Sequence, residues 1–79
     1  MIKYFSASWC TPCQNMKKSF EEGDLDGVEM VDADHQRDEV EKYEVRSIPT
    51  FIKLNDEGEE VDRVVGTVSR SQFLEFKDA

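Results

Sequence analysis

The sequence predicts an α/β fold in which three helices flank one mixed four-stranded sheet, in the order β-α-β-α-β-β-α. Short apolar segments alternate with amphipathic ones in the first half of the chain, which is typical of parallel strands joined by right-handed crossovers. Two later apolar segments are separated by a turn, as in a β-hairpin. Because 79 residues suit one compact domain and no Gly/Ser linker divides them, we expect a single domain over residues 1–79.

The first strand and helix follow from local patterning. Residues 2–7 are apolar and aromatic and end in small residues, which predicts a strand. In residues 11–22, three apolar side chains recur at i, i+3 and i+7, namely Cys13, Met16 and Phe20. This spacing predicts an amphipathic helix that ends near the glycine after it.

The second strand and helix are shorter. Residues 28–33 carry valines and a methionine and predict a strand, while residues 36–43 predict a short helix. Val40 and Tyr43 are expected to face the core from this helix. The acidic residues are densest between 21 and 44, and we interpret them as a solvated surface.

The last third of the chain predicts a hairpin and a helix. Residues 50–54 and 60–66 form apolar segments around the turn Asn55-Asp56-Glu57-Gly58, in which Gly58 suits a positive φ. A serine and a glutamine three positions later then form a capping box that begins a helix (Ser69 and Gln72).

Charge and composition exclude several classes of protein. The 10 basic and 18 acidic residues give a net charge of −8, which opposes binding to nucleic acid or to acidic membranes. The sequence contains no run of about 18 apolar residues, so no membrane-spanning helix is predicted. The N-terminus lacks the apolar region of a signal peptide. Two cysteines cannot form a disulfide scaffold. A free pair without an export signal indicates the cytoplasm, and we expect a monomer.

The informative motif is Trp9-Cys10-Thr11-Pro12-Cys13, at the junction of the first strand and helix. Cys10 is expected at the helix N-terminus, where unpaired N–H groups and the helix dipole favour a thiolate. Cys13 lies one turn further on the same face, within reach of a disulfide. Pro12 is tolerated in the first turn because its missing N–H is no loss there.

This arrangement suits dithiol–disulfide exchange, in which an exposed Cys10 attacks and a buried Cys13 resolves the mixed disulfide. Two other interpretations remain open. A zinc site needs four ligands, and only Cys10, Cys13 and the isolated His35 are candidates, so we expect no metal. The other interpretation is that both cysteines are inert core residues. Inert cysteines, however, do not require C-x-x-C spacing at a helix start.

A second motif, Ser47-Ile48-Pro49-Thr50, precedes the third strand. Proline is tolerated as the first residue of a strand, so the motif alone can be purely structural. The sharper interpretation is a cis Ile48–Pro49 bond, because cis peptide bonds are nearly confined to X-Pro.

In these motifs and in their spacing, the chain resembles the thioredoxin family. The matching segments are Trp9 to Cys13, Val45 to Phe51, and Val65-Gly66 before the last helix. The resemblance covers essentially the whole chain, but the family's extra N-terminal strand and helix are missing. It implies a minimal thioredoxin-like fold near glutaredoxins in size.

The resemblance implies a role for each matching position. Cys10 would be the nucleophile and Cys13 the resolving thiol, with Trp9 shielding the pair. Pro49 would be cis and lie against the cysteines, while the backbone of Ile48 would bind an extended substrate segment as an added strand. Gly66 would let that substrate approach closely.

Four departures from the family pattern bear on the chemistry. Thr11 stands where the family usually has Gly, a position that by the resemblance tunes the redox potential, and Gln14 replaces a usual Lys beside the thiols. Tyr4 stands where a buried Asp is usual, and Met30 stands in place of a nearby Lys. We expect that no buried carboxylate deprotonates Cys13 here and that the Tyr4 hydroxyl or water serves instead.

The function implied is a thiol–disulfide oxidoreductase that reduces protein disulfides, has no cofactor beyond the Cys10–Cys13 disulfide, and is recycled by a thioredoxin reductase, an NADPH-dependent flavoenzyme. One alternative is a glutathione-dependent, glutaredoxin-like enzyme, which the short length favours. Glutaredoxins usually have Pro-Tyr between the cysteines, however, and the acidic chain is unsuited to anionic glutathione. The other alternative is a non-catalytic module that uses the same surface only for binding.

Overall fold

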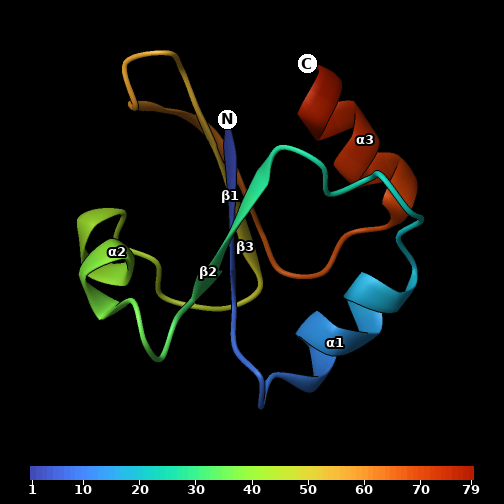
Figure 1. Cartoon of the computed structure of the whole chain (residues 1–79), viewed down its shortest axis with the longest axis horizontal. Coiled ribbons are helices and arrows are strands. Elements are labelled where there is room, and N and C mark those ends of the chain that lie inside the picture. The colour runs from blue at the N-terminus through green and yellow to red at the C-terminus, as the bar shows by residue number, and fades with distance from the viewer.

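The computed structural model describes all 79 residues and confirms the mixed four-stranded sheet with three helices. The strands lie in the order β2-β1-β3-β4, with β1 parallel to β2 and antiparallel to β3, and with β3 antiparallel to β4 (Figure 1). In chain order the elements are β1 (Ile2–Ser6), α1 (Thr11–Lys18), β2 (Val28–Asp32), α2 (Arg37–Lys42), β3 (Thr50–Leu54), β4 (Glu60–Val65) and α3 (Arg70–Asp78). None of the helices has the length and apolar run that a membrane crossing requires.

The capping signals and turns lie where the sequence predicts them. Ser69 caps α3 through a complete capping box with Gln72, and Gly58 adopts a φ of +81° in the turn before β4. The prediction for α1 is too long, because the helix ends at Lys18. The Ser19 hydroxyl then donates to the carbonyl of Met16 at 2.6 Å, which satisfies a carbonyl that a longer helix would have bonded.

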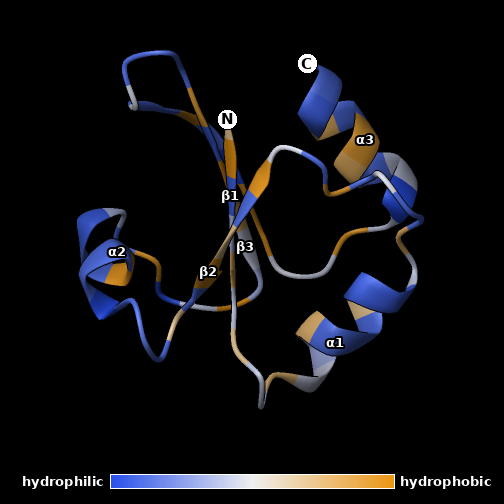
Figure 2. Cartoon of the chain, in the orientation of Figure 1, coloured by the Kyte–Doolittle hydropathy of each residue, from blue (hydrophilic) through white to orange (hydrophobic).

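Two apolar clusters cover the two faces of the sheet, because successive strand residues point to opposite faces. The face under α1 and α3 holds Ile2, Tyr4, Met16, Phe51, Phe73 and Phe76. The face under α2 holds Phe5, Val31, Tyr43, Val45, Ile52 and Leu54. Figure 2 shows hydrophobic residues concentrated in the strands and hydrophilic ones over much of the helices.

Two sequence interpretations are corrected by burial. Asp24 lies in the acidic stretch that we interpreted as solvated, yet it is 7% exposed and paired with Arg70. A carboxylate that finds a guanidinium partner can be buried, and local patterning does not show a partner 46 residues away. Met30, which with Tyr4 takes the place of the family's buried Asp and nearby Lys, is not itself buried and is 40% exposed.

Candidate functional site

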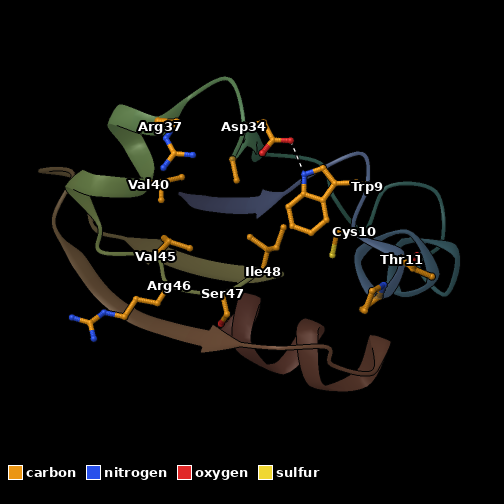
Figure 3. Close-up of a pocket in the computed structure, with 12 residues that line it drawn as sticks. Trp9, Cys10, Thr11, Asp34, Arg37, Val40, Val45, Arg46, Ser47 and Ile48 are labelled. Atoms are coloured by element: carbon orange, nitrogen blue, oxygen red, sulfur yellow. Dashed lines mark hydrogen bonds between the residues drawn. The ribbon is translucent and has the colours of Figure 1, made fainter.

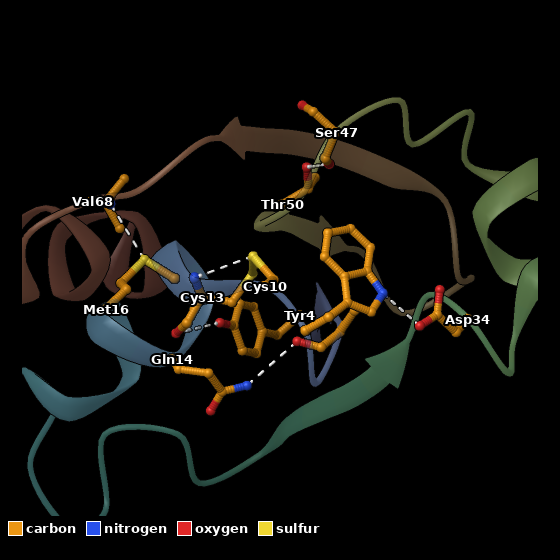
Figure 4. The surroundings of a disulfide bond; sticks show 11 residues. Tyr4, Cys10, Cys13, Gln14, Met16, Asp34, Ser47, Thr50 and Val68 are labelled. Atoms are coloured by element: carbon orange, nitrogen blue, oxygen red, sulfur yellow. Dashed lines mark hydrogen bonds between the residues drawn. A yellow bond between two sulfur atoms is a disulfide. The ribbon is translucent and has the colours of Figure 1, made fainter.

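The two cysteines form a disulfide where β1 passes into α1 (Figure 4). Their Cα atoms lie 5.3 Å apart, a separation typical of disulfides. The predicted pairing of Cys10 with Cys13 is therefore present, and the structure represents the oxidised form of the chain.

Cys10 is the N-cap residue of α1, as the motif predicts. Its sulfur accepts a hydrogen bond from the backbone N–H of Cys13 at 3.2 Å, and its carbonyl accepts from the N–H of Gln14 at 3.1 Å. Pro12 occupies the first turn, where no N–H is needed. After reduction, the same N–H group and the positive end of the helix stabilise negative charge on the Cys10 sulfur.

The expectation of an exposed Cys10 is wrong in extent. The residue is 4% exposed and Cys13 is 1% exposed, because both pack with Ala7 and the side chain of Ile48. Cys10 nevertheless lines a groove open to solvent, whereas Cys13 does not. Although both residues are buried, a partner in the groove can therefore reach the sulfur of Cys10 and not that of Cys13.

The side chain of Tyr4 lies beside Cys13, in the interior of the protein. Tyr4 is 1% exposed and stacks on Phe51 with ring centroids 4.6 Å apart. Its hydroxyl donates to the carbonyl of Cys13 at 3.4 Å (Figure 4). Burial raises the pKa of Tyr4, and a contact with Ser6 acts in the opposite direction. The hydroxyl consequently stays protonated at neutral pH as a donor, not a base.

The segment before β3 lies on the other side of the cysteines. The Ile48–Pro49 bond is cis, as predicted, and the carbonyl of Pro49 accepts the N–H of Gly66 at 2.8 Å. The N–H and carbonyl of Ile48 have no hydrogen-bond partner within the chain. Gly66 has a φ of +94°, and a Cβ built there would face open space. This edge therefore offers unpaired backbone groups and room for another chain.

A groove of about 590 Å³ runs from Cys10 toward α2 (Figure 3). Trp9 stands at its rim, 66% exposed, and its indole N–H donates to a carboxylate oxygen of Asp34 at 2.6 Å. Thr11 and Pro12 also line the groove, beside Cys10. Asp34 is not among the residues predicted for the site, and its only signal in the sequence is an acidic residue shortly after the second strand.

No group of three or more His, Cys, Asp or Glu side chains is arranged to hold a metal ion. His35 instead faces Asp32, with the imidazole Nδ1 3.0 Å from a carboxylate oxygen. The redox-active group available in this chain is its own disulfide.

Comparison with known proteins gives the family. The model of the thioredoxin family matches residues 1–79. A thioredoxin of Staphylococcus epidermidis is 42% identical over 79 residues, covering 94% of this chain and 75% of that protein. The chain belongs to the thioredoxin family. A rice protein named Thioredoxin H5 is 42% identical over 70 residues, covering 84% of this chain and 51% of its own length.

Solved thioredoxins have the same fold. The Fasciola hepatica thioredoxin superposes with a TM-score of 0.77 at 34% identity, covering 95% of this chain and 74% of that one. The Malassezia sympodialis thioredoxin gives 0.78 at 28% identity, covering 98% and 71%. With the C-x-x-C disulfide in place, the chain is a thiol–disulfide oxidoreductase of the thioredoxin type, a protein-disulfide oxidoreductase.

Proposed function

We propose that Cys10 is the attacking thiol and Cys13 the resolving thiol in the reduction of protein disulfides. The observation that carries this assignment is the asymmetry of the pair. Cys10 lines the open groove and caps the helix, whereas Cys13 is 1% exposed and lines no part of the groove. A large substrate can reach only the first sulfur.

The reaction balances as two successive exchanges. The Cys10 thiolate attacks one sulfur of the substrate disulfide, and the other substrate sulfur leaves as a thiolate and takes up a proton. The Cys13 thiol loses its proton to solvent and attacks the Cys10 sulfur, and the second substrate sulfur leaves as a thiolate that takes up a proton. Two electrons have then passed from the chain to the substrate, and the chain holds the Cys10–Cys13 disulfide.

The substrate would bind along the edge formed by Ile48, Pro49 and Gly66. The unpaired N–H and carbonyl of Ile48 can pair with an extended segment as an added strand. The space in front of Gly66 lets that segment approach closely. Trp9, largely exposed, would cover the mixed disulfide from the groove side, with Thr11 and Pro12 shaping the loop between the cysteines.

The cycle is completed by an external electron donor, because the chain ends each turnover oxidised. By family membership the donor would be a thioredoxin reductase, an NADPH-dependent flavoenzyme, and no further cofactor is required of the chain itself. The setting would be the cytoplasm, whose reducing poise keeps such a pair in the dithiol form. Residues 1–79 would act as one domain and as a monomer, without nucleic acid or membrane partners.

Trapping the mixed disulfide tests the assignment. Cys13→Ser keeps the attacking thiol and removes the resolving one, so a disulfide-bonded protein substrate should remain covalently attached through Cys10. Cys10→Ser is the matched control and should trap nothing under the same conditions. Mass spectrometry of the quenched mixture identifies the bonded cysteine.

Three other results would contradict the proposal in different ways. Trapping through Cys13 in the Cys10→Ser variant would reverse the roles. Full biological activity of the double Cys→Ser variant would indicate a binding module. Turnover of a small glutathione mixed disulfide, without turnover of protein disulfides, would indicate a glutaredoxin-like enzyme.

A further inference from the structure

The groove beside Cys10 carries the opposite charge balance to the rest of the molecule. The chain has a net charge of −8. The charged residues that line the groove are Arg37, Arg46 and Asp34, which sum to +1. A surface that departs in sign from the whole protein at a proposed binding site is a candidate for substrate selection.

Both guanidinium groups are free to bind another molecule. Arg37 and Arg46 are exposed, and neither has a carboxylate within 4.0 Å or a hydrogen-bond partner in the chain. By contrast, Arg63 is paired with Glu60, and Arg70 with Glu21 and Asp24. An unpaired guanidinium presents a planar set of donors that matches a carboxylate.

The side chains that line the groove are of three kinds: the reactive sulfur with the tryptophan, apolar side chains, and arginines (Figure 3). The sulfur of Cys10 and the ring of Trp9 lie at one end, and the two arginines lie toward the other end. The side chain of Ile48 lies between these two ends, and Val40 and Val45 line the groove beside the arginines. The Asp34 carboxylate accepts the indole N–H of Trp9, so the single negative charge is held beside the tryptophan.

We propose that this groove selects protein disulfides in which an apolar residue and then an Asp or Glu lie within a few residues of the reacting cysteine. The inference rests on the proposed function, since it requires the substrate to bond to Cys10. An extended segment rises about 3.3 Å per residue. Such a segment, attached at Cys10, would place its apolar side chain against Val45 and Ile48 and its carboxylate at Arg37 or Arg46.

The sign of the predicted preference makes the inference testable. Net charge alone predicts that an acidic protein reacts faster with basic substrates. At about 0.15 M salt, however, charges further than roughly 8 Å from the substrate are largely screened. The charges nearest to a segment in the groove are then those that line it, two guanidinium groups and the Asp34 carboxylate, so acidic substrates should react faster.

The test uses three symmetric disulfide-linked peptides. In each peptide a valine adjoins the cysteine on both sides, and the second and third residues from the cysteine on both sides are all Glu, all Gln or all Lys. The three peptides are otherwise identical. The pre-reduced protein is mixed with each peptide at 0.15 M salt, and Trp9 fluorescence follows a single turnover. Each turnover converts the protein dithiol to its disulfide and the peptide disulfide to two thiols, so no recycling enzyme is needed.

We expect the Glu peptide to react at least about fivefold faster than the Lys peptide. In the double variant Arg37→Gln/Arg46→Gln, the Lys peptide should become the faster one. The matched control is Lys17→Gln/Lys18→Gln, which removes the same charge from exposed positions that do not line the groove. This control should keep the preference for Glu.

Two results would overturn the inference: a Lys peptide that reacts as fast as the Glu peptide or faster in the unmodified protein, or a preference that the arginine variant leaves unchanged. Failure of the proposed function would look different. In that case the neutral Gln peptide would not be reduced by the unmodified protein at all.

Discussion

The side chains that cover the two faces of the sheet pack differently. On the face under α1 and α3, Phe51 lies between two rings, with its centroid 4.6 Å from Tyr4 and 4.9 Å from Phe73. On the face under α2, one aromatic pair is present, Phe5 with Tyr43 at 6.2 Å, and α2 itself contains no buried residue. The first face is a dense aromatic core, whereas the second is thinner.

The difference matches the two tasks of the site. Tyr4, whose hydroxyl donates to the carbonyl of Cys13, belongs to the dense face, so the backbone that carries the Cys13 sulfur is supported by close packing. The groove wall belongs to the α2 face, where Val40 is only partly buried and Arg37 is exposed. The molecule therefore combines a rigid support for the disulfide with a wall that depends on surface side chains.

The largest expected effect is on the dense face. Phe51→Ala removes a ring that is 0% exposed, and such changes cost about 3–5 kcal/mol. Val40→Ala on α2 should cost about 1 kcal/mol or less. Urea unfolding followed by circular dichroism measures both, and equal losses would show that the two faces are packed alike.

An intermediate loss of stability is expected on changing Lys3, which links β1 to α2 and to β2 through ion pairs. Its ammonium group pairs with Glu39 and with Glu29, although the residue is only 9% exposed. Burial lowers the pKa of Lys3, but the hydrogen bonds with Glu39 and Glu29 outweigh burial and raise it overall. Lys3→Met strands partly buried carboxylates and should cost about 1–3 kcal/mol in the free energy of unfolding.

The control for Lys3 is a double variant. Lys3→Met combined with Glu39→Met replaces the pair by apolar side chains and should recover much of the loss, because an apolar pair is often as stable as a buried ion pair. No recovery would show that Lys3 contributes through its packing over the Tyr43 ring instead.

The smallest effect is expected in the acid dependence of stability. The Arg70 guanidinium, followed by the backbone N–H of Glu21, holds the pKa of Asp24 below its usual range. The stability from this carboxylate is thus present above the unfolded pKa of about 3.9 and is lost as pH falls through the lower folded pKa. In urea titrations between about pH 2 and 6, Asp24→Asn should flatten the acid side of the curve. An unchanged slope would contradict the assignment.

Local patterns were sufficient to predict most of this structure. The order of elements, the α3 capping box, the cis Ile48–Pro49 bond and the Cys10–Cys13 pair all depend on residues within a few positions of each other or on a family motif. The strand limits are correct to within a residue for the same reason, since alternation and turns are short-range signals.

The features that could not be predicted depend on contacts between distant segments. The pairing of Lys3 with Glu39 and of Asp24 with Arg70 spans 36 and 46 residues. The depth of Cys10 depends on Ile48, which packs over it from the segment before β3. The groove likewise combines residues of the cysteine loop, of α2 and of that segment, so its charge balance is not visible in any one stretch of sequence.

The most direct measurement is the redox equilibrium of the Cys10–Cys13 pair, titrated with glutathione and dithiothreitol buffers and followed by Trp9 fluorescence. We expect one reversible two-electron transition with a midpoint of roughly −270 to −230 mV, as for a reducing dithiol. A midpoint well above roughly −180 mV would indicate an oxidant or isomerase, and the absence of any reversible transition would contradict the redox function itself.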